Sequence, residues 1–236
     1  MKPLAYSTAV MSWPLVMSAI RHLQQEGEGI EPIDLNLGTP PALVLSATAL
    51  EAFVNEISSL THAFVYDRDA YSVPAQTKGG LPRHMDEDKV AGIRHDSRGS
   101  FYDRYKNLVK GLGIPSFRHI QELSYLRDLR DAVVHFRGCD ISIVLMEDDI
   151  IRSVQEPPRV FQHLKTIEVD ARPVLGRDVE PGEGEWHLTM STNAMGYWCV
   201  VMVTKAILHI LEEIPKGAFR GLVWRTYRTS GFWDGH

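Results

Sequence analysis

The sequence predicts an all-α fold: an antiparallel helical bundle with long irregular insertions and a small β element. Two observations carry this prediction. Apolar residues recur at spacings of three and four in several segments longer than ten residues, which is typical of amphipathic helices. Convincing strand patterns are rare among the 236 residues, of which 44% are hydrophobic and 23% charged. This composition suffices for one buried core, so we expect a single domain over residues 1–236.

The first two expected helices cover 4–25 and 43–64. The first is expected to bend or begin near Pro14, because proline is tolerated only in the first helical turn. A turn-rich connector, 27–42, separates the two helices. The second helix has the clearest pattern of the chain, with a single apolar stripe. The stripe consists of Leu43, Ala47, Leu50, Val54 and Ile57.

Three further helices are expected after this. Ser100 resembles an N-cap for a helix over 101–113, with Asp103 completing a capping box and glycines ending the helix. Pro115 and Ser116 are expected to open the next helix, which runs through Gly138. The last expected helix covers about 190–213 and stops before a proline.

The remaining segments are irregular in pattern. Residues 67–100 are rich in glycine and proline and read as an exposed insertion. Residues 139–186 form an irregular acidic segment, within which 139–146 resembles a short strand. The tail, 216–236, mixes four basic residues with five aromatic residues. Such a tail could bind single-stranded RNA, although packing on the bundle or on a second copy is the simpler expectation.

The charge and cysteine content restrict location and partners. The net charge of −5 excludes a protein that coats nucleic acid through bulk charge, and leaves room for a local basic site. Cys139 and Cys199 form no CxxC motif, so a reduced cytoplasmic protein is expected. The nearly uncharged run over 188–204 reads as too short and too polar to span a bilayer, so no membrane partner is expected.

The helix expected before Gly138 carries unusual charge beside its apolar stripe. Arg127, Asp131 and His135 follow one another at intervals of four and therefore share one ridge. Asp131 can reach and orient the imidazole, and Arg127 could hold Asp131 from the preceding turn. Arg130 lies beside the apolar side. That side consists of Ile120, Leu123, Leu126, Leu129, Val133 and Phe136.

This helix and an earlier one resemble the HEPN superfamily (higher eukaryotes and prokaryotes nucleotide-binding). The stretch "RDAVVH" fits the R-x4-6-H motif, with Arg130 and His135 as its two ends. The stretch "SATALEAFVNEI" is similar to the second helix of many HEPN-like bacterial proteins. The likeness covers roughly residues 40–138, with the 190–213 helix closing the bundle.

The resemblance implies a homodimer in which two motifs meet at a cleft, and a metal-independent endoribonuclease of a toxin–antitoxin or phage-defence system. His135 would act as general base or acid, Arg130 would clamp the phosphate, and Asp131 would orient His135. The products would carry 2′,3′-cyclic phosphates, without a cofactor. Arg127 and Arg137 are secondary candidates for phosphate binding. RNA and an antitoxin or regulatory protein are the implied partners.

The sequence departs from the HEPN pattern directly after the motif. Antitoxin-paired members carry H-x-Tyr after the motif, and here the residues are His135, Phe136 and Arg137. Regulation by modification of that tyrosine is therefore not expected. Glu51 and Asn55, polar residues of an apolar helix, are supporting candidates; Glu51 could hold an arginine of the motif helix.

Three alternatives stay open. The charged residues could simply be an ion-paired helix end. The chain could be a non-catalytic HEPN-like binding module. It could also be a metal-dependent phosphohydrolase, although the required residues match no standard ligand spacing. Those residues are His84, Asp86, Asp88, His95 and Asp96. No G-x-S-x-G, P-loop, dinucleotide or HExxH motif occurs in the sequence.

Overall fold

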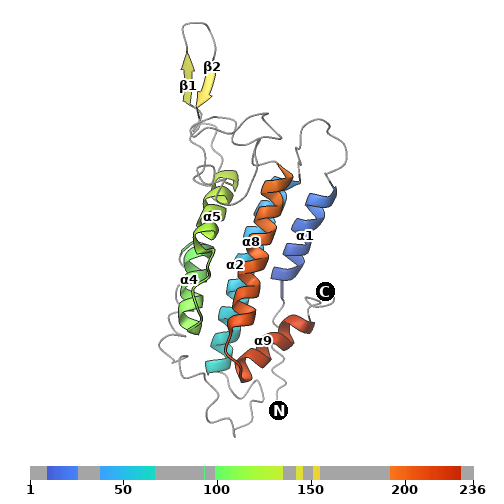
Figure 1. Cartoon of the computed structure of the whole chain (residues 1–236), viewed down its shortest axis with the longest axis vertical. Helices are drawn as coiled ribbons and strands as arrows, with labels where there is room; N and C mark the ends of the chain where they lie inside the picture. The colour runs from blue at the N-terminus through green and yellow to red at the C-terminus, as the bar shows by residue number, and fades with distance from the viewer. Residues whose placement is uncertain are drawn as a thin grey trace. The chain divides into compact units, whose positions relative to one another are not determined.

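The computed structural model describes residues 10–25, 38–66, 93, 99–134, 142–145, 151–154 and 192–229. Within these ranges the fold is all-α, which confirms the predicted class, and one two-stranded antiparallel ribbon accompanies the helices (Figure 1). The helices are α1 (Ser12–Gln25), α2 (Thr39–Tyr66), α4 (Phe101–Leu112), α5 (Ile120–Val134), α8 (Asn193–Glu213) and α9 (Ala218–Thr229). The strands are β1 (Ser142–Leu145) and β2 (Ile151–Val154).

The chain packs into two compact units. The first is formed by Met1–Leu15, Thr48–Arg118 and Thr204–His236, and the second by Val16–Ala47 and His119–Val203. Helices α1, α2 and α8 therefore contribute residues to both units. The expectation of one domain over the whole chain stays a prediction.

In the first unit, α9 packs antiparallel to the second half of α2. The rings of Phe64 and Phe219 lie 5.3 Å apart, and those of Phe53 and Tyr227 lie 5.5 Å apart. Residue numbers thus fall along α9 as they rise along α2. All four rings are buried, so this contact forms a large part of the apolar core of the unit.

The predicted apolar stripe of the second helix is confirmed. Its members are at most 2% exposed. The helix itself is longer than predicted, because α2 begins at Thr39 rather than at residue 43. Pro40 and Pro41 fall in its first turn, where the missing N–H groups have no intrahelical partner in any case. The two prolines therefore start the helix, whereas the sequence interpretation placed them in the connector.

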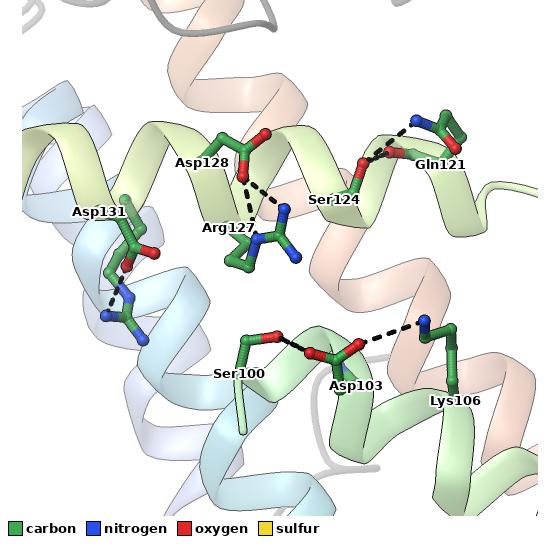
Figure 2. Close-up of polar contacts among 9 residues, drawn as sticks. Ser100, Asp103, Lys106, Gln121, Ser124, Arg127, Asp128 and Asp131 are labelled. Atoms are coloured by element: carbon green, nitrogen blue, oxygen red, sulfur yellow. Dashed lines mark hydrogen bonds and ion pairs between the residues drawn. The ribbon is translucent and has the colours of Figure 1, made fainter. Parts of the chain in front are cut away.

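The ends of α4 are those that the sequence predicts. The Ser100 hydroxyl accepts from the Asp103 N–H at 3.3 Å and donates to Oδ2 of Asp103 at 2.8 Å (Figure 2). At the other end Gly113 has φ 66°, in the left-handed region, and its N–H donates to the Lys110 carbonyl. Local sequence thus fixes both ends of this helix.

The start of α5 differs from the prediction. The helix begins at Ile120, not at Pro115 and Ser116. The preceding residues are held by contacts within the first unit: the Pro115 carbonyl lies 2.9 Å from Nε2 of His209, and the buried Phe117 ring packs against Tyr105. Because the Pro115 carbonyl and the Phe117 side chain are engaged in these contacts, they are not available to a helix that begins at Pro115.

The structure also describes parts of the acidic segment and of the tail. Within the segment 139–146, which resembled a short strand or extended piece, residues 142–145 form β1, which pairs antiparallel with β2. The tail contains α9, a helix that the sequence interpretation missed. Most of the insertion over 67–100 and most of the acidic segment over 139–186 lie outside the described residues.

In the second unit, Gly196 of α8 allows close packing against α1 and α2. A Cβ at this position would overlap Leu23 Cδ2 and lie 2.9 Å from Thr39 Oγ1. Both neighbours are buried, and Thr39 Oγ1 donates to the Thr192 carbonyl at 3.0 Å. Glycine is therefore required here by the close approach of the three helices.

We expect Gly196→Ala to lower the free energy of unfolding by about 1–2 kcal/mol, because the buried neighbours must repack. Gly221→Ala is the matched control: it also lies in a helix, and no atom stands within 4 Å of its added Cβ. This substitution should stabilise the protein by about 0.5–1 kcal/mol. Urea denaturation followed by circular dichroism measures both, and equal effects of the two substitutions would contradict the packing argument.

Three buried acids make the fold sensitive to alkali. Burial raises the pKa of the Tyr105 hydroxyl and of the Cys199 thiol. Burial, followed by the charge of Glu56, raises the pKa of Tyr227. The folded chain thus keeps protons that the unfolded chain releases once the pH passes the ordinary values, about 8.5 for cysteine and 10 for tyrosine. The stability from these groups is complete below those values and is lost above them.

We therefore expect the urea midpoint to fall with rising pH between about pH 9 and 11.5, most steeply above about pH 10 where tyrosine ordinarily titrates. Tyr227→Phe should reduce this slope, because it removes one of the three groups. Urea titrations at a series of pH values test this. A Tyr227→Phe slope identical to that of the wild type would contradict the assignment.

Candidate functional site

The last turn of α5 carries an ion pair at the predicted site. Nη1 of Arg130 lies 2.8 Å from Oδ1 of Asp131, as Figure 2 shows at the Asp131 label. The Arg130 side chain is 24% exposed and that of Asp131 is 47% exposed. The guanidinium is therefore mostly covered but accessible from solvent. The bidentate fork of an arginine suits binding of a phosphate, and a neighbouring carboxylate restricts its orientation.

One turn earlier, Arg127 has a partner that the sequence did not predict. Its Nε and Nη2 both donate to Oδ1 of Asp128, at 2.9 and 2.6 Å (Figure 2). The expected contact from Arg127 to Asp131 is thus replaced by two pairs of adjacent residues, Arg127 with Asp128 and Arg130 with Asp131. The spacing of four residues favoured a contact across one turn. In the folded helix, the side-chain rotamers instead bring each arginine to the aspartate that follows it.

The predicted apolar side of α5 is confirmed at its three leucines, whereas Ile120 and Val133 are half-buried and Phe136 lies outside the described residues. Leu123, Leu126 and Leu129 are fully buried, and Ser124 and Tyr125 are also buried. The four charged side chains from Arg127 to Asp131 are half-buried. They therefore lie along the border of the packed side, where a ligand could reach them.

His135 and Arg137 lie outside the described residues, as does the end of the helix that was expected to reach Gly138. The described part of α5 ends at Val134, whose side chain is 50% exposed. The predicted roles of His135 as acid or base and of Arg137 as a phosphate contact stay predictions.

Glu51 and Asn55 both contact an arginine of α4. Nη1 of Arg104, on α4, donates to Oδ1 of Asn55 at 2.7 Å, and its Nη2 donates to Oε1 of Glu51. The Arg104 side chain is only 13% exposed. These contacts join α2 to α4 within the first unit. The expectation that Glu51 holds an arginine of α5 stays a prediction.

Another polar residue of α2, Glu56, accepts four hydrogen bonds. Its Oε1 accepts from the N–H groups of Met11 and Ser12, at 2.6 and 2.9 Å. Its Oε2 accepts from the hydroxyls of Ser12 and Tyr227, at 2.7 and 2.6 Å. Glu56 is 8% exposed. The carboxylate stands at the start of α1, whose first turn contains no acidic residue, and so stabilises the positive end of that helix.

Arg104 and the partners of Glu56 are the polar residues that sequence reasoning missed. The sequence indicated that the polar residues of α2 need partners, but no local pattern identified those partners. Their contacts connect helices and leave few polar groups for a ligand, so they are structural contacts rather than parts of a site.

The predicted metal-binding alternative cannot be placed, because His84, Asp86, Asp88, His95 and Asp96 lie outside the described residues. Within the ranges that the structure describes, no group of three or more His, Cys, Asp or Glu side chains could hold a metal ion.

Two helices have the length and composition of a membrane span: Thr39–Phe64 in α2 and Asn193–Glu213 in α8. The structure buries 56% and 61% of their apolar windows, as it would for core helices. The judgement that the apolar run over 188–204 is too short is thereby corrected, because α8 continues to Glu213. Cytoplasmic localisation stays a prediction.

Comparisons with known proteins give no relative. No protein-family model, no curated protein and no solved structure matches the chain.

Proposed function

We propose that the chain is a metal-independent endoribonuclease of HEPN type, acting in the cytoplasm as a toxin or defence effector. The observation that supports this is the Arg130–Asp131 pair at the end of α5, five residues before His135 in an R-x4-H motif. An all-α fold agrees with the family. An arginine on a rigid helix has the planar fork of donors that suits a phosphodiester.

In the proposed reaction, His135 removes the proton of a ribose 2′-OH, and the 2′-oxygen attacks the adjacent phosphorus. The bond from phosphorus to the 5′-oxygen breaks, and that oxygen takes a proton from a second His135 across a homodimer cleft. The products are a 2′,3′-cyclic phosphate and a 5′-hydroxyl. Arg130 offsets the charge that develops on the phosphoryl oxygens. Asp131 keeps the guanidinium in position.

One observation favours a second candidate function, a non-catalytic HEPN-like binding module. The Arg130 charge is already paired with a carboxylate, and a phosphate must compete with Asp131 for it. A module that binds a partner protein, such as an antitoxin, through this face of α5 needs no histidine in a reactive position.

The two functions are separated by one assay. Purified full-length protein is incubated with a mixed-sequence RNA in EDTA, and the ends of the fragments are identified by mass spectrometry. Cleavage with 2′,3′-cyclic phosphate ends supports the nuclease. Intact RNA contradicts it and leaves the binding module. Cleavage that requires added Mn²⁺ also contradicts it, because the reaction then depends on a metal.

A further inference from the structure

Helix α9 has one face buried in the first unit. Phe219, Val223 and Tyr227 follow at intervals of four and are each at most 1% exposed. Phe219 packs on Phe64 of α2, and Tyr227 donates its hydroxyl to Glu56. The apolar face formed by these three residues is thus used in packing, and Leu222 and Trp224 are half-buried.

The side of α9 next to this buried face, together with the exposed side beyond it, is basic and aromatic. Arg220, Trp224 and Arg228 also follow at intervals of four, and Arg225 adjoins them around the helix. Arg225 and Arg228 are exposed, and Arg220 and Trp224 are half-buried. Lys216, exposed in the turn before the helix, extends the same charge. We refer to these five residues as the basic face of α9.

Two members of the basic face are fixed in place by contacts with neutral groups. The Arg220 guanidinium lies over the Trp224 ring, 5.4 Å from its centroid, and its Nη1 donates to the Ile214 carbonyl at 3.2 Å. Nε1 of Trp224 donates to the Leu211 carbonyl at 3.2 Å. Neither of these contacts cancels the positive charge. The ring and the guanidinium are therefore held in an arrangement that costs little further entropy on binding.

The chemistry of this face indicates a polyanion with stacking bases. Residues 214–229 contain four basic residues and no acidic residue, in a chain of net charge −5. Such a local excess of positive charge attracts phosphates, and an indole beside arginine offers a surface on which a base can stack. An anionic membrane fits less well, because a helix that binds a bilayer inserts its apolar face. Here that face is already buried.

We propose that the basic face of α9 is a binding surface for single-stranded RNA. The choice of RNA over DNA rests on the nuclease function proposed above. Arg225, Arg228 and Lys216 contact phosphates along the strand. The Arg220–Trp224 pair supports one unpaired base.

The test measures binding by the full-length protein to a fluorescein-labelled 2′-O-methyl oligonucleotide, which has no free 2′-hydroxyl and cannot be cleaved by this route. We expect Arg225→Gln with Arg228→Gln to weaken binding at least about tenfold at 0.1 M salt, because two phosphate contacts are lost. The slope of log K against log salt should fall by about 1.4, or about 0.7 for each contact on a single strand.

The matched control changes the same net charge elsewhere. Arg21→Gln with Lys110→Gln removes two exposed basic side chains, from α1 and α4. It should change the affinity by less than about twofold, since neither residue belongs to the basic face. Trp224→Leu should weaken binding at least about fivefold, whereas Trp224→Phe, which retains a ring, should keep most of the affinity. Circular dichroism confirms that each variant is folded.

Three results would overturn the proposal. Equal weakening by the control pair would show that only net charge matters. Unchanged binding in the Arg225 and Arg228 variant would show that RNA binds elsewhere. Binding to phosphatidylglycerol vesicles but not to the oligonucleotide would show a membrane surface instead. Because the oligonucleotide is not cleaved, an inactive wild type that still binds through α9 rejects the nuclease alone, and an active enzyme with unchanged binding rejects only this surface.

Discussion

Glu56→Ala is expected to lower the free energy of unfolding by about 3–5 kcal/mol, because it leaves three buried donors and one part-buried donor without this acceptor. The donors are the N–H groups of Met11 and Ser12 and the hydroxyls of Ser12 and Tyr227. Proteins of this size are stable by about 5–15 kcal/mol, so the loss is a large fraction of the total. Urea denaturation followed by circular dichroism measures it.

Two further substitutions separate the contributions at Glu56. Glu56→Gln preserves the shape and one acceptor oxygen, and should cost less than Glu56→Ala. Glu213→Ala is the control, because that exposed glutamate of α8 should change stability by less than about 0.5 kcal/mol. If Glu56→Ala were as mild as the control, the carboxylate would not be the main tie between α1, α2 and α9.

At the proposed catalytic site, His135→Ala is expected to reduce RNA cleavage in EDTA by about 10²–10⁴-fold, the usual contribution of a general acid or base. Arg130→Ala is expected to cost about 10²–10³-fold, because it removes the donors that stabilise charge in the transition state. Arg130→Lys should restore only part of this, since an ammonium cannot bind a phosphate through a planar fork. Initial rates with a labelled oligoribonucleotide measure all three.

These variants should remain folded. The Arg130–Asp131 pair is partly exposed, and such pairs contribute at most about 1 kcal/mol to stability. Arg21→Ala, which removes an exposed arginine from α1, is the matched control and should cleave RNA at the wild-type rate. Retention of full activity in both His135→Ala and Arg130→Ala would contradict the assignment of the motif as the active site. If expression is toxic to cells, that toxicity should disappear with Arg130→Ala.

The sequence predicted correctly those features that depend on residues close together in the chain. The apolar stripe of α2, the N-cap that Ser100 provides for α4, and the glycine that ends α4 all rest on spacings of four or fewer. At these distances one helical turn brings the residues together whatever the rest of the protein does. The burial of Leu123, Leu126 and Leu129 in α5 follows from the same periodicity.

The features that the sequence did not predict depend on residues far apart in the chain. The sequence did not indicate α9 as a helix, although Phe219, Val223 and Tyr227 have helical spacing, because basic residues surround them. It also did not indicate that Arg104 of α4 is a partner of Glu51. Both outcomes depend on which helix lies against α2, and a pattern within one helix carries no information about its neighbour.

By itself, then, the sequence determined the helical class, most helix positions and the charged residues at the end of α5. The tertiary structure decided the partners of those charges, the start of α5 and the burial of α9. The separation between Tyr227 and Glu56, 171 residues, shows why. A hydrogen bond between such distant residues forms only when the packing of apolar faces has already brought their helices together, and that packing depends on the whole chain.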